Sequence, residues 1–360
     1  MSHQRPADET QEIEVPEAVA AQLDSVGVVS EVGAPEVTAS EASADVAGSA
    51  LLRFALPSMA ALGSLGALEY LRYRFQRRHM FEPTRYPEGD WHPERSGLEV
   101  VDVDFTSGDG TRLNGWWIEA SPTPSRLEPM TVVYCHGNSG SIAERVEIYK
   151  HLRRLGVNIF AFDYRGYGRS SGEPSEDGVC ADARAAIDHA NGVLGVPYSR
   201  LILFGHSLGG AIAIDTARRR PRIAGLVVQS SFTQNLDMAR HFYPDLPVHW
   251  ITRNGFRSID KVPELLMPKL FIHGAADKKV PFSQGQALFA AAAEPKAWLP
   301  IARADHNDVH QWGGLRYFSR LVRFGREARR HGLAAASPGE NEGASGSDAG
   351  VGAPPSIAGR

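Results

Sequence analysis

Short runs of apolar residues recur through the middle of the chain. Five of them lack the alternation of apolar and polar positions that marks a half-exposed strand, so they are typical of strands buried on both faces of a parallel sheet. These runs are Met130–Tyr134, Val157–Phe162, Leu201–Phe204, Ile223–Val228 and Leu270–Ile272. Segments with helical periodicity separate and follow them: Ile142–Leu155, Val179–Val193, Gly209–Arg218, Gln284–Ala293 and Leu315–Arg329. This order predicts a mostly parallel, doubly wound α/β sheet whose ligand site lies at the carboxyl ends of the strands.

Further strand patterns complete the predicted sheet. Leu98–Phe105 and Leu113–Ile118 alternate apolar and polar residues and flank a turn at Ser107–Gly110. They predict an antiparallel hairpin ahead of the parallel strands. Lys296–Pro300 is the last predicted strand, and residues 80–333 together form the predicted globular domain.

Both ends of the chain differ in composition from this domain. Residues 1–49 contain ten carboxylates, one arginine and no aromatic residue, and residues 334–360 are rich in Gly, Ser, Ala and Pro. Such segments cannot bury enough apolar surface to offset the entropy of ordering them, so we expect both to be disordered. Beyond the acidic segment the chain has 37 basic and 32 acidic residues. So mild an excess, without a basic stripe, argues against a nucleic-acid partner.

Residues 50–79 join an apolar run to a basic one. Phe54–Leu68 contains no charged residue, and four arginines follow it within ten positions. The run is shorter than the roughly 20 apolar residues of a spanning helix, and it contains proline and glycine. Three interpretations stay open: a short signal anchor, an interfacial helix, or a helix packed on the domain. The arginines suit anionic lipid headgroups and would keep the domain cytoplasmic, at the cytoplasmic face of a membrane.

The cysteine content indicates the compartment. The chain has two cysteines, Cys135 and Cys180, with no metal-ligand spacing around either of them. Two are too few for the disulfide framework of a secreted domain. We therefore expect buried free thiols in a reducing compartment.

The strongest chemical signal follows the strand Leu201–Phe204. The next residues read Gly205-His206-Ser207-Leu208-Gly209-Gly210, and a helical pattern begins at once. A G-x-S-x-G between strand and helix is the context of a nucleophile elbow, in which side chains two residues from the serine would collide with the tight turn. Ser207 is therefore the candidate nucleophile, with a glycine-rich structural turn as the alternative. His206 is expected to pack within the elbow.

A base and an acid are expected after later strands, because the order of a triad on this kind of sheet is serine, acid, histidine. His306 follows the last predicted strand and is the candidate base. Asp277 follows the strand Leu270–Ile272 and is the candidate acid, which would fix the tautomer of His306. Asp305 and Asp308 compete for that role, but their closeness to His306 in the chain favours supporting roles.

Acyl chemistry also needs donors for a developing oxyanion. The backbone N–H of Leu208, next to the nucleophile, is one candidate. The N–H of Asn138, in the loop after the strand Met130–Tyr134, is the second, and His136 before it is expected to be a structural hydrogen-bonding residue. The glycine-rich segment Asp163–Gly172 lacks the Lys-Ser/Thr ending of a phosphate-binding loop. It is expected instead to support the oxyanion side of the cleft.

Taken together, these residues resemble the α/β-hydrolase superfamily. More narrowly, the chain resembles the membrane-anchored α/β-hydrolase-domain serine hydrolases related to fungal bud-emergence proteins and animal protein depalmitoylases. The matching segments lie between about residues 70 and 330: His136-Gly137-Asn138, Asp163–Gly172, Gly205–Gly210, His273-Gly274 with Asp277, and His306-Asn307-Asp308. The resemblance implies an α/β-hydrolase fold, a triad of Ser207, Asp277 and His306, and an N-terminal membrane anchor. The animal depalmitoylases attach through N-terminal cysteines, whereas this chain has none before Cys135, so depalmitoylation does not carry over.

The sequence thus predicts a serine hydrolase of carboxylic esters or thioesters that forms an acyl-enzyme on Ser207. No metal or organic cofactor is implied, and the expected partners are a small-molecule or lipid-like acyl substrate and a membrane surface. Aminopeptidase and C–C bond hydrolase activities use the same triad and stay open, as does a non-catalytic membrane-associated scaffold. A short lid is expected at about residues 231–262, and its aromatic residues could line an acyl site or form its own core.

Overall fold

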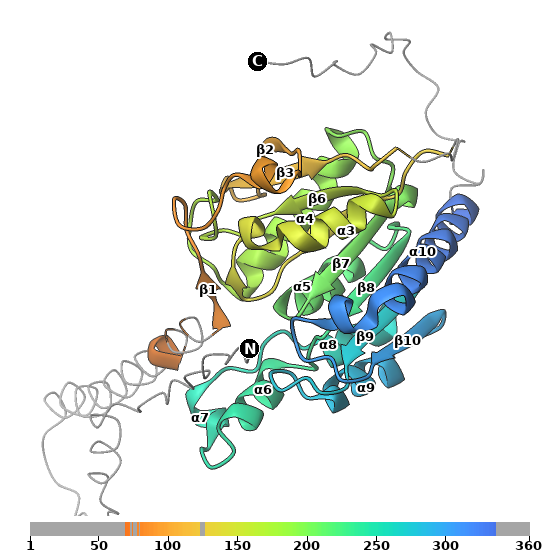
Figure 1. Cartoon of the computed structure of the whole chain (residues 1–360). Helices are drawn as coiled ribbons and strands as arrows, with labels where there is room; N and C mark the ends of the chain where they lie inside the picture. Colours follow the sequence, from red (N-terminus) through yellow and green to blue (C-terminus); the bar gives the residue numbers. More distant parts are fainter. Residues whose placement is uncertain (1–68, 73, 75–77, 79, 123–126, 336–360) are drawn as a thin grey trace, which may run out of the picture. The chain divides into compact units, whose positions relative to one another are not determined.

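Eight strands among the described residues form one sheet (Figure 1). The computed structural model describes residues 69–72, 74, 78, 80–122 and 127–335, all within one compact unit, Ser64–Arg360. The strands follow the order β10-β9-β8-β7-β4-β6-β3-β2. Their bounds are β2 Val101–Thr106, β3 Arg112–Ile118, β4 Thr131–Cys135, β6 Asn158–Phe162, β7 Leu201–His206, β8 Gly225–Gln229, β9 Lys269–Gly274 and β10 Lys296–Ile301.

The sheet is parallel from β10 to β6, and β3 is antiparallel to both β6 and β2. Every residue of β4, β7, β8 and β9 is buried, as expected for strands covered on both faces. Two short strands, β1 (Glu82–Pro83) and β5 (Ser139–Gly140), pair in parallel outside this sheet. The predicted fold class, including the antiparallel hairpin β2–β3, is therefore confirmed.

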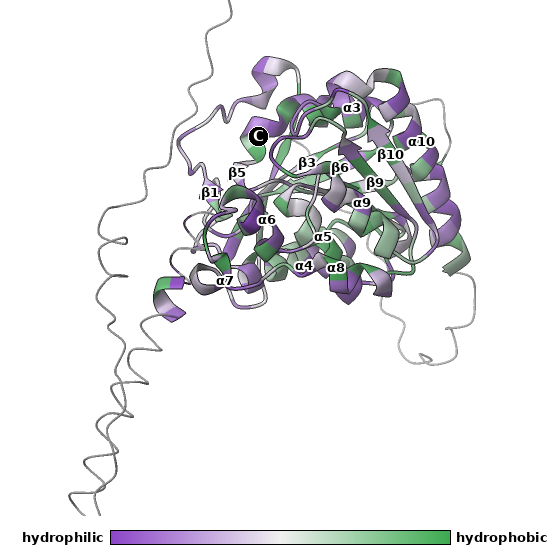
Figure 2. Ribbon diagram, turned by 90° about the horizontal axis from the view of Figure 1, so that it is seen from below, coloured by the Kyte–Doolittle hydropathy of each residue, from purple (hydrophilic) through white to green (hydrophobic). Residues whose placement is uncertain are grey.

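Helices cover the two faces of the sheet and create two apolar cores, one on each side (Figure 2). One core contains Ile187, Ile212 and Leu288; the other contains Tyr149 and Phe324. The helices of the first face are α4 (Glu176–Gly192), α5 (Leu208–Arg219), α8 (Ser258–Lys261) and α9 (Phe282–Ala291), and those of the second are α3 (Val146–Arg154) and α10 (Val309–Ala335). Short 3₁₀ segments occur at Pro93–Ser96, Ile142–Arg145, Tyr198–Arg200 and Val262–Glu264.

Helix boundaries differ from the sequence prediction by a few residues, most clearly in α3 and α10. The helix predicted from Ile142 begins with the 3₁₀ turn Ile142–Arg145, so α3 itself starts at Val146. The helix predicted over Leu315–Arg329 starts six residues earlier, at Val309, and is kinked at Gly314, which has φ +45°. The positive φ interrupts the helical periodicity, so the apolar positions before the kink do not continue the pattern of those after it, and the sequence does not predict one helix. At its other end α10 continues to Ala335, two residues into the segment predicted to be a tail.

The segment predicted to be a lid lies between β8 and β9 and contains α6 (Asn235–Phe242), α7 (Val248–Ile251) and α8. Its aromatic side chains do not form one core. Phe232 is 6% exposed, whereas Phe242 and Trp250 are 51% and 65% exposed. Phe232 belongs to the same core as Ile212 on the first face of the sheet, whereas Phe242 and Trp250 face outward, so a core formed by the lid itself is not seen for these three residues.

The chain before the domain is described only in part. Residues 69–72, 74 and 78 are helical, whereas 1–49 and Phe54–Leu68 lie outside the described residues, as do residues 336–360. The Arg72 guanidinium donates hydrogen bonds to the carbonyls of His249 (3.0 Å) and Thr252 (3.2 Å), which joins this helical segment to α7. Among the residues that are described, no helix has both the length and the apolar character needed to cross a bilayer.

Two glycines of α10 provide a matched test of this packing. A methyl group at Gly332 would overlap the backbone carbonyl of Ser199, whereas one at Gly325 would meet no atom within 4 Å. We expect Gly332→Ala to lower the free energy of unfolding by about 1–3 kcal/mol through overpacking. Gly325→Ala should raise it by about 0.5–1 kcal/mol, because alanine favours a helix interior. Urea denaturation of both variants measures the difference, and a stabilised Gly332→Ala protein would contradict this packing of α10.

Candidate active site

Ser207 lies in the turn between β7 and α5, with φ +56° and ψ −120°. A positive φ is strained for a residue with a side chain, and such strain is typical of functional sites. Two hydrogen bonds to the backbone of Ser207 hold this conformation: the N–H of Ser207 donates to the carbonyl of Gln229 (2.9 Å), and the Ser231 hydroxyl donates to the carbonyl of Ser207 (2.9 Å). The serine is therefore held as the elbow predicts.

The glycines of the elbow are required by close backbone approaches. A methyl group at Gly205 would overlap the carbonyl of Gly209, and a methyl group at Gly209 would overlap the carbonyl of Cys135 at the end of β4. The tight turn that was predicted from the G-x-S-x-G spacing is thus present. Only glycine lets α5 begin so close to its own strand and to the neighbouring strand.

The structure brings the three predicted triad residues together. His306 Nε2 lies 2.9 Å from Ser207 Oγ, and His306 Nδ1 lies 2.8 Å from Asp277 Oδ2. Because the carboxylate only accepts, Nδ1 carries the proton and Nε2 accepts from the serine hydroxyl. Ser207, Asp277 and His306 are 7%, 9% and 5% exposed, so the chain of hydrogen bonds is largely shielded from water. The two competitors lie elsewhere, since Asp305 accepts from the backbone N–H groups of His306 and Lys278.

The charge on Asp277 is set by opposing effects. Burial of the carboxyl disfavours its ionised form, but hydrogen bonds from His273 and His306 outweigh burial and hold the pKa of Asp277 well below its ordinary value. The carboxylate is therefore ionised at neutral pH and can stabilise a positive charge on His306. Sequence reasoning noted His273 only as part of the segment that matches the family and did not foresee its contact with Asp277.

His206 packs beside the triad without joining it. Its Nε2 lies 3.2 Å from the carbonyl of His306, and its ring lies 5.1 Å from the His306 ring. Burial lowers the pKa of His206 well below its ordinary value, so the ring stays neutral. A neutral Nε2–H then donates to that carbonyl and helps to fix the loop that carries His306. This agrees with the packing role expected for His206.

The loop after β4 lies against the nucleophile. A methyl group at Gly137 would be 3.5 Å from Ser207 Cβ, and Asn138 follows directly. The carbonyl of Asn138 accepts from the backbone N–H of Glu82 (3.0 Å) and from the Tyr167 hydroxyl (2.7 Å). These bonds fix the orientation of the loop beside Ser207.

The segment Asp163–Gly172 supports that loop from below, as expected. Tyr164 donates its hydroxyl proton to the carbonyl of His136 (3.0 Å), while Asp163 Oδ1 accepts from the backbone N–H of Ile142 (2.9 Å). Asp163 Oδ1 also lies 3.4 Å from His136 Nε2, and both side chains are fully buried. Burial raises the pKa of Asp163 despite this histidine. Sequence reasoning foresaw the supporting role of the segment but not the two tyrosines that perform it.

The two thiols are buried and take no part in the site. Cys135 and Cys180 are both free cysteines, as expected. Burial raises the pKa of Cys135 to about 12, which suppresses the reactive thiolate at neutral pH. Cys135 instead contributes its backbone carbonyl to the close approach with Gly209.

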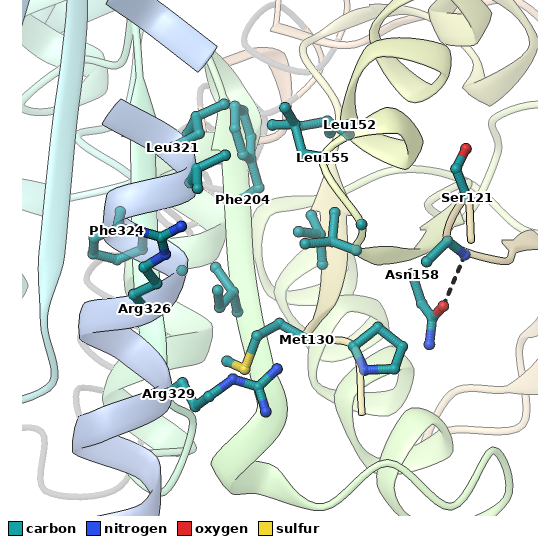
Figure 3. A pocket seen from close by; sticks show the side chains of 18 of the residues that line it. Ser121, Met130, Leu152, Leu155, Asn158, Phe204, Leu321, Phe324, Arg326 and Arg329 are labelled. Atoms are coloured by element: carbon teal, nitrogen blue, oxygen red, sulfur yellow. Dashed lines mark hydrogen bonds between the residues drawn. The ribbon is translucent and has the colours of Figure 1, made fainter. Parts of the chain in front are cut away.

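A cavity of about 640 Å³ lies on the far side of the molecule from this site (Figure 3). It is bounded by α10 and by the amino ends of β4, β6 and β7, where Met130, Asn158 and Ile202 lie. Ser207 follows the opposite, carboxyl end of β7. Ligands of open α/β sheets bind at the carboxyl ends of the strands, so the triad and not this cavity marks the candidate active site.

Comparisons with known proteins agree with this architecture. A family model described as serine aminopeptidase, S33, matches residues 129–258. An uncharacterized protein of Mycobacterium tuberculosis is 36% identical over 274 residues, which cover 75% of this chain and 94% of the relative. The α/β-hydrolase domain-containing protein WAV2 of Arabidopsis thaliana is 32% identical over 250 residues, covering 64% of this chain and 80% of the relative.

Solved structures with the same fold are also found. The esterase Pf2001 of Pyrococcus furiosus superposes with a TM-score of 0.56 at 24% sequence identity, covering 68% of this chain and 98% of that chain. At that identity the likeness concerns the fold alone. The narrower resemblance to bud-emergence proteins and depalmitoylases stays a prediction. The sheet order, the elbow at Ser207 and relatives above 30% identity over most of their length lead to one conclusion: the chain belongs to the α/β-hydrolase superfamily.

Proposed function

We propose that this protein is a serine hydrolase that cleaves carboxylic esters or thioesters through an acyl-enzyme on Ser207. One observation carries the proposal: Ser207, His306 and Asp277 form a continuous, buried chain of hydrogen bonds of 2.9 and 2.8 Å. An elbow alone could be a structural turn, and a scaffold could keep the fold. A correctly ordered nucleophile, base and carboxylate from the ends of three strands is what acyl transfer requires.

The reaction follows from this geometry. Ser207 Oγ attacks the acyl carbon while its proton moves to His306 Nε2, and the carbonyl π electrons move onto oxygen. Collapse of this tetrahedral species breaks the bond to the alcohol or thiol, which leaves with the proton from Nε2. Water then attacks the acyl-enzyme while His306 Nε2 accepts its proton; the acyl–Oγ bond breaks, Ser207 Oγ takes the proton back from Nε2, and the acid is released. Asp277 keeps the imidazole in the required tautomer and stabilises its transient positive charge.

The oxyanion is assigned to two backbone donors. Leu208 is the first residue of α5, so its N–H has no acceptor within the helix and lies at the positive end of the helix dipole. Asn138 supplies the second N–H from the loop that packs on Ser207. The two donors come from two segments that both adjoin the nucleophile, the start of α5 and the loop after β4, as an oxyanion site requires.

Esters and thioesters are the substrates we propose. The matching family model is described as a serine aminopeptidase, so this activity is the main alternative. An aminopeptidase must bind the substrate ammonium, usually with a carboxylate. The triad carboxylate, Asp277, cannot take that role, because both of its oxygens accept hydrogen bonds from His306 and from backbone N–H groups. C–C bond hydrolysis has no specific observation in its favour.

We also propose that the protein acts at a membrane surface, on its cytoplasmic side. The uncharged run Phe54–Leu68 ends one residue before the helical segment that Arg72 joins to α7. On the lid, Phe242, Leu246 and Trp250 are 51%, 42% and 65% exposed. Exposed aromatic and aliphatic residues next to arginines suit the interface of an anionic bilayer. An acyl substrate could then reach Ser207 from the lipid.

The nucleophile can be tested with a fluorophosphonate reagent and nitrophenyl esters. We expect the parent protein to be labelled and Ser207→Ala to be unlabelled, with kcat/KM reduced by about 10³-fold or more. Ser121→Ala, at the distant cavity, is the matched control and should keep both properties. Labelling that survives in Ser207→Ala would exclude this mechanism. Faster cleavage of aminoacyl nitroanilides than of esters would favour the aminopeptidase alternative.

Two buried tyrosines test the support of the oxyanion loop. Tyr167→Phe removes the bond to the Asn138 carbonyl, so we expect kcat on a nitrophenyl ester to fall about tenfold, with KM little changed. Tyr149 is equally buried, but its hydroxyl has no partner among the described residues. Tyr149→Phe should therefore leave kcat unchanged. Equal kcat values for the two variants would argue against a role for Asn138.

Membrane binding can be tested by sedimentation of the full chain with phosphatidylglycerol-containing vesicles. The variant Phe242→Ser/Leu246→Ser/Trp250→Ser should bind at least about tenfold more weakly, because three apolar side chains no longer enter the interface. Val193→Ser/Leu266→Ser/Leu315→Ser is the matched control, since these residues are 70%, 71% and 86% exposed at other places. Equal loss in both variants would contradict a lid-centred contact.

A further inference from the structure

The carboxylate of Asp277 is surrounded by hydrogen-bond donors. Its Oδ1 accepts from the backbone N–H groups of Lys279 (2.9 Å) and Val280 (2.8 Å). Its Oδ2 accepts from His306 Nδ1 (2.8 Å), and it lies 3.3 Å from His273 Nε2. Three of these contacts belong to the turn and to the triad. The fourth comes from His273, a side chain outside the triad that takes part in no proton transfer of the mechanism above.

The tautomer of His273 follows from a second contact. His273 Nε2 lies 3.0 Å from the carbonyl oxygen of Val280, which can only accept. Nε2 therefore carries a proton, and the same N–H is directed at both this carbonyl and Asp277 Oδ2. The other ring nitrogen lies against the first turns of α9, where a methyl group at Gly285 would overlap Nδ1. The absence of a side chain at residue 285 gives the ring the space for this orientation.

The ring has little freedom to move. His273 is the fifth residue of β9 and is 1% exposed. Phe282 packs edge-on against the ring, with centroids 5.7 Å apart, and Trp298 of β10 lies 6.5 Å away. A donor fixed by a strand and two aromatic rings loses little entropy when it bonds a carboxylate, so it can hold that carboxylate in one place.

We propose that His273 is a positioning residue that holds Asp277 Oδ2 in line with His306 Nδ1. The inference rests on the proposed function, because it assigns a role within the same hydrolytic site. The carboxylate needs such a donor since burial works against its charge, and the bond from His273 is among those that keep its pKa low. Without it, Oδ2 would have one donor fewer and could rotate away from the imidazole.

The test uses two substitutions of nearly equal volume in the full chain. His273→Gln keeps an N–H donor near the position of Nε2, whereas His273→Met places a thioether there. With a nitrophenyl ester as substrate, we expect His273→Met to lower kcat about 10- to 100-fold and to leave KM little changed, because a hydrogen bond to a charged group is lost. Gln should stay within about threefold of the parent protein. Equal losses in both variants would reduce His273 to a packing role and overturn the proposal.

A double-mutant cycle separates action through Asp277 from a general effect on folding. In the Asp277→Asn background, His273→Met should change kcat by less than about twofold, because the carboxylate it positions is gone. A full, additive loss would overturn the proposal. The low-field NMR resonance of the His306 Nδ1–H proton gives a readout that does not depend on activity. It should persist in the His273→Gln variant and shift or vanish in the His273→Met variant. An unchanged resonance in the His273→Met variant would overturn the proposal even if the protein hydrolyses no ester. Failure of the proposed function is a different result: the activity of the parent protein would then not change on Ser207→Ala.

Discussion

The close approach of three backbones at the start of α5 governs the rest of the site. Gly205, Gly209 and the carbonyl of Cys135 lie so near one another that an added methyl group at either glycine would overlap its neighbour. This contact lets the helix begin beside the carboxyl ends of β7 and β4 at once. As a result, Ser207 and the first residue of α5 lie beside the loop after β4, where the Gly137 position is 3.5 Å from Ser207 Cβ. A larger residue at either glycine would separate them.

The main elements of the site could be predicted because they depend on local pattern and chain order. Buried strands are marked by continuous apolar runs, and a catalytic residue on this kind of sheet follows a strand, which placed Ser207, Asp277 and His306. The supporting residues could not be predicted in the same way. Tyr164 and Tyr167 act through hydroxyl groups whose acceptors lie 28 and 29 residues away along the chain. Such partners are set by tertiary packing, which no periodicity reveals. Gly314 shows the same limit, since its kink separates the first residues of α10, from Val309, from the helical pattern that begins at Leu315.

Buried polar groups give the site its rigidity. The segment Asp163–Gly172 supports the loop at Asn138 and is itself tied to α4 through Arg165, whose guanidinium bonds both carboxylate oxygens of Asp182. Inside a protein such bonds are stronger than in water, but each group must keep its partner. The loops around Ser207 are therefore held by a small number of specific bonds between side chains and backbone. Apolar packing alone, which is less directional, would leave them free to shift.

The position of the predicted lid along the chain affects which parts of the sequence can change without disturbing the candidate site. This segment is inserted between β8 and β9, while the three residues of the triad follow β7, β9 and β10. Among its described residues, Ser231 at the start of the segment bonds the elbow, through the carbonyl of Ser207. Lengthening a surface segment costs little closure entropy, about 0.6 kcal/mol for each doubling of its length. The outer part of the predicted lid, α6 and α7, can therefore change in length or composition without moving the strands that carry Ser207, Asp277 and His306, whereas α8 is constrained by its packing on the sheet.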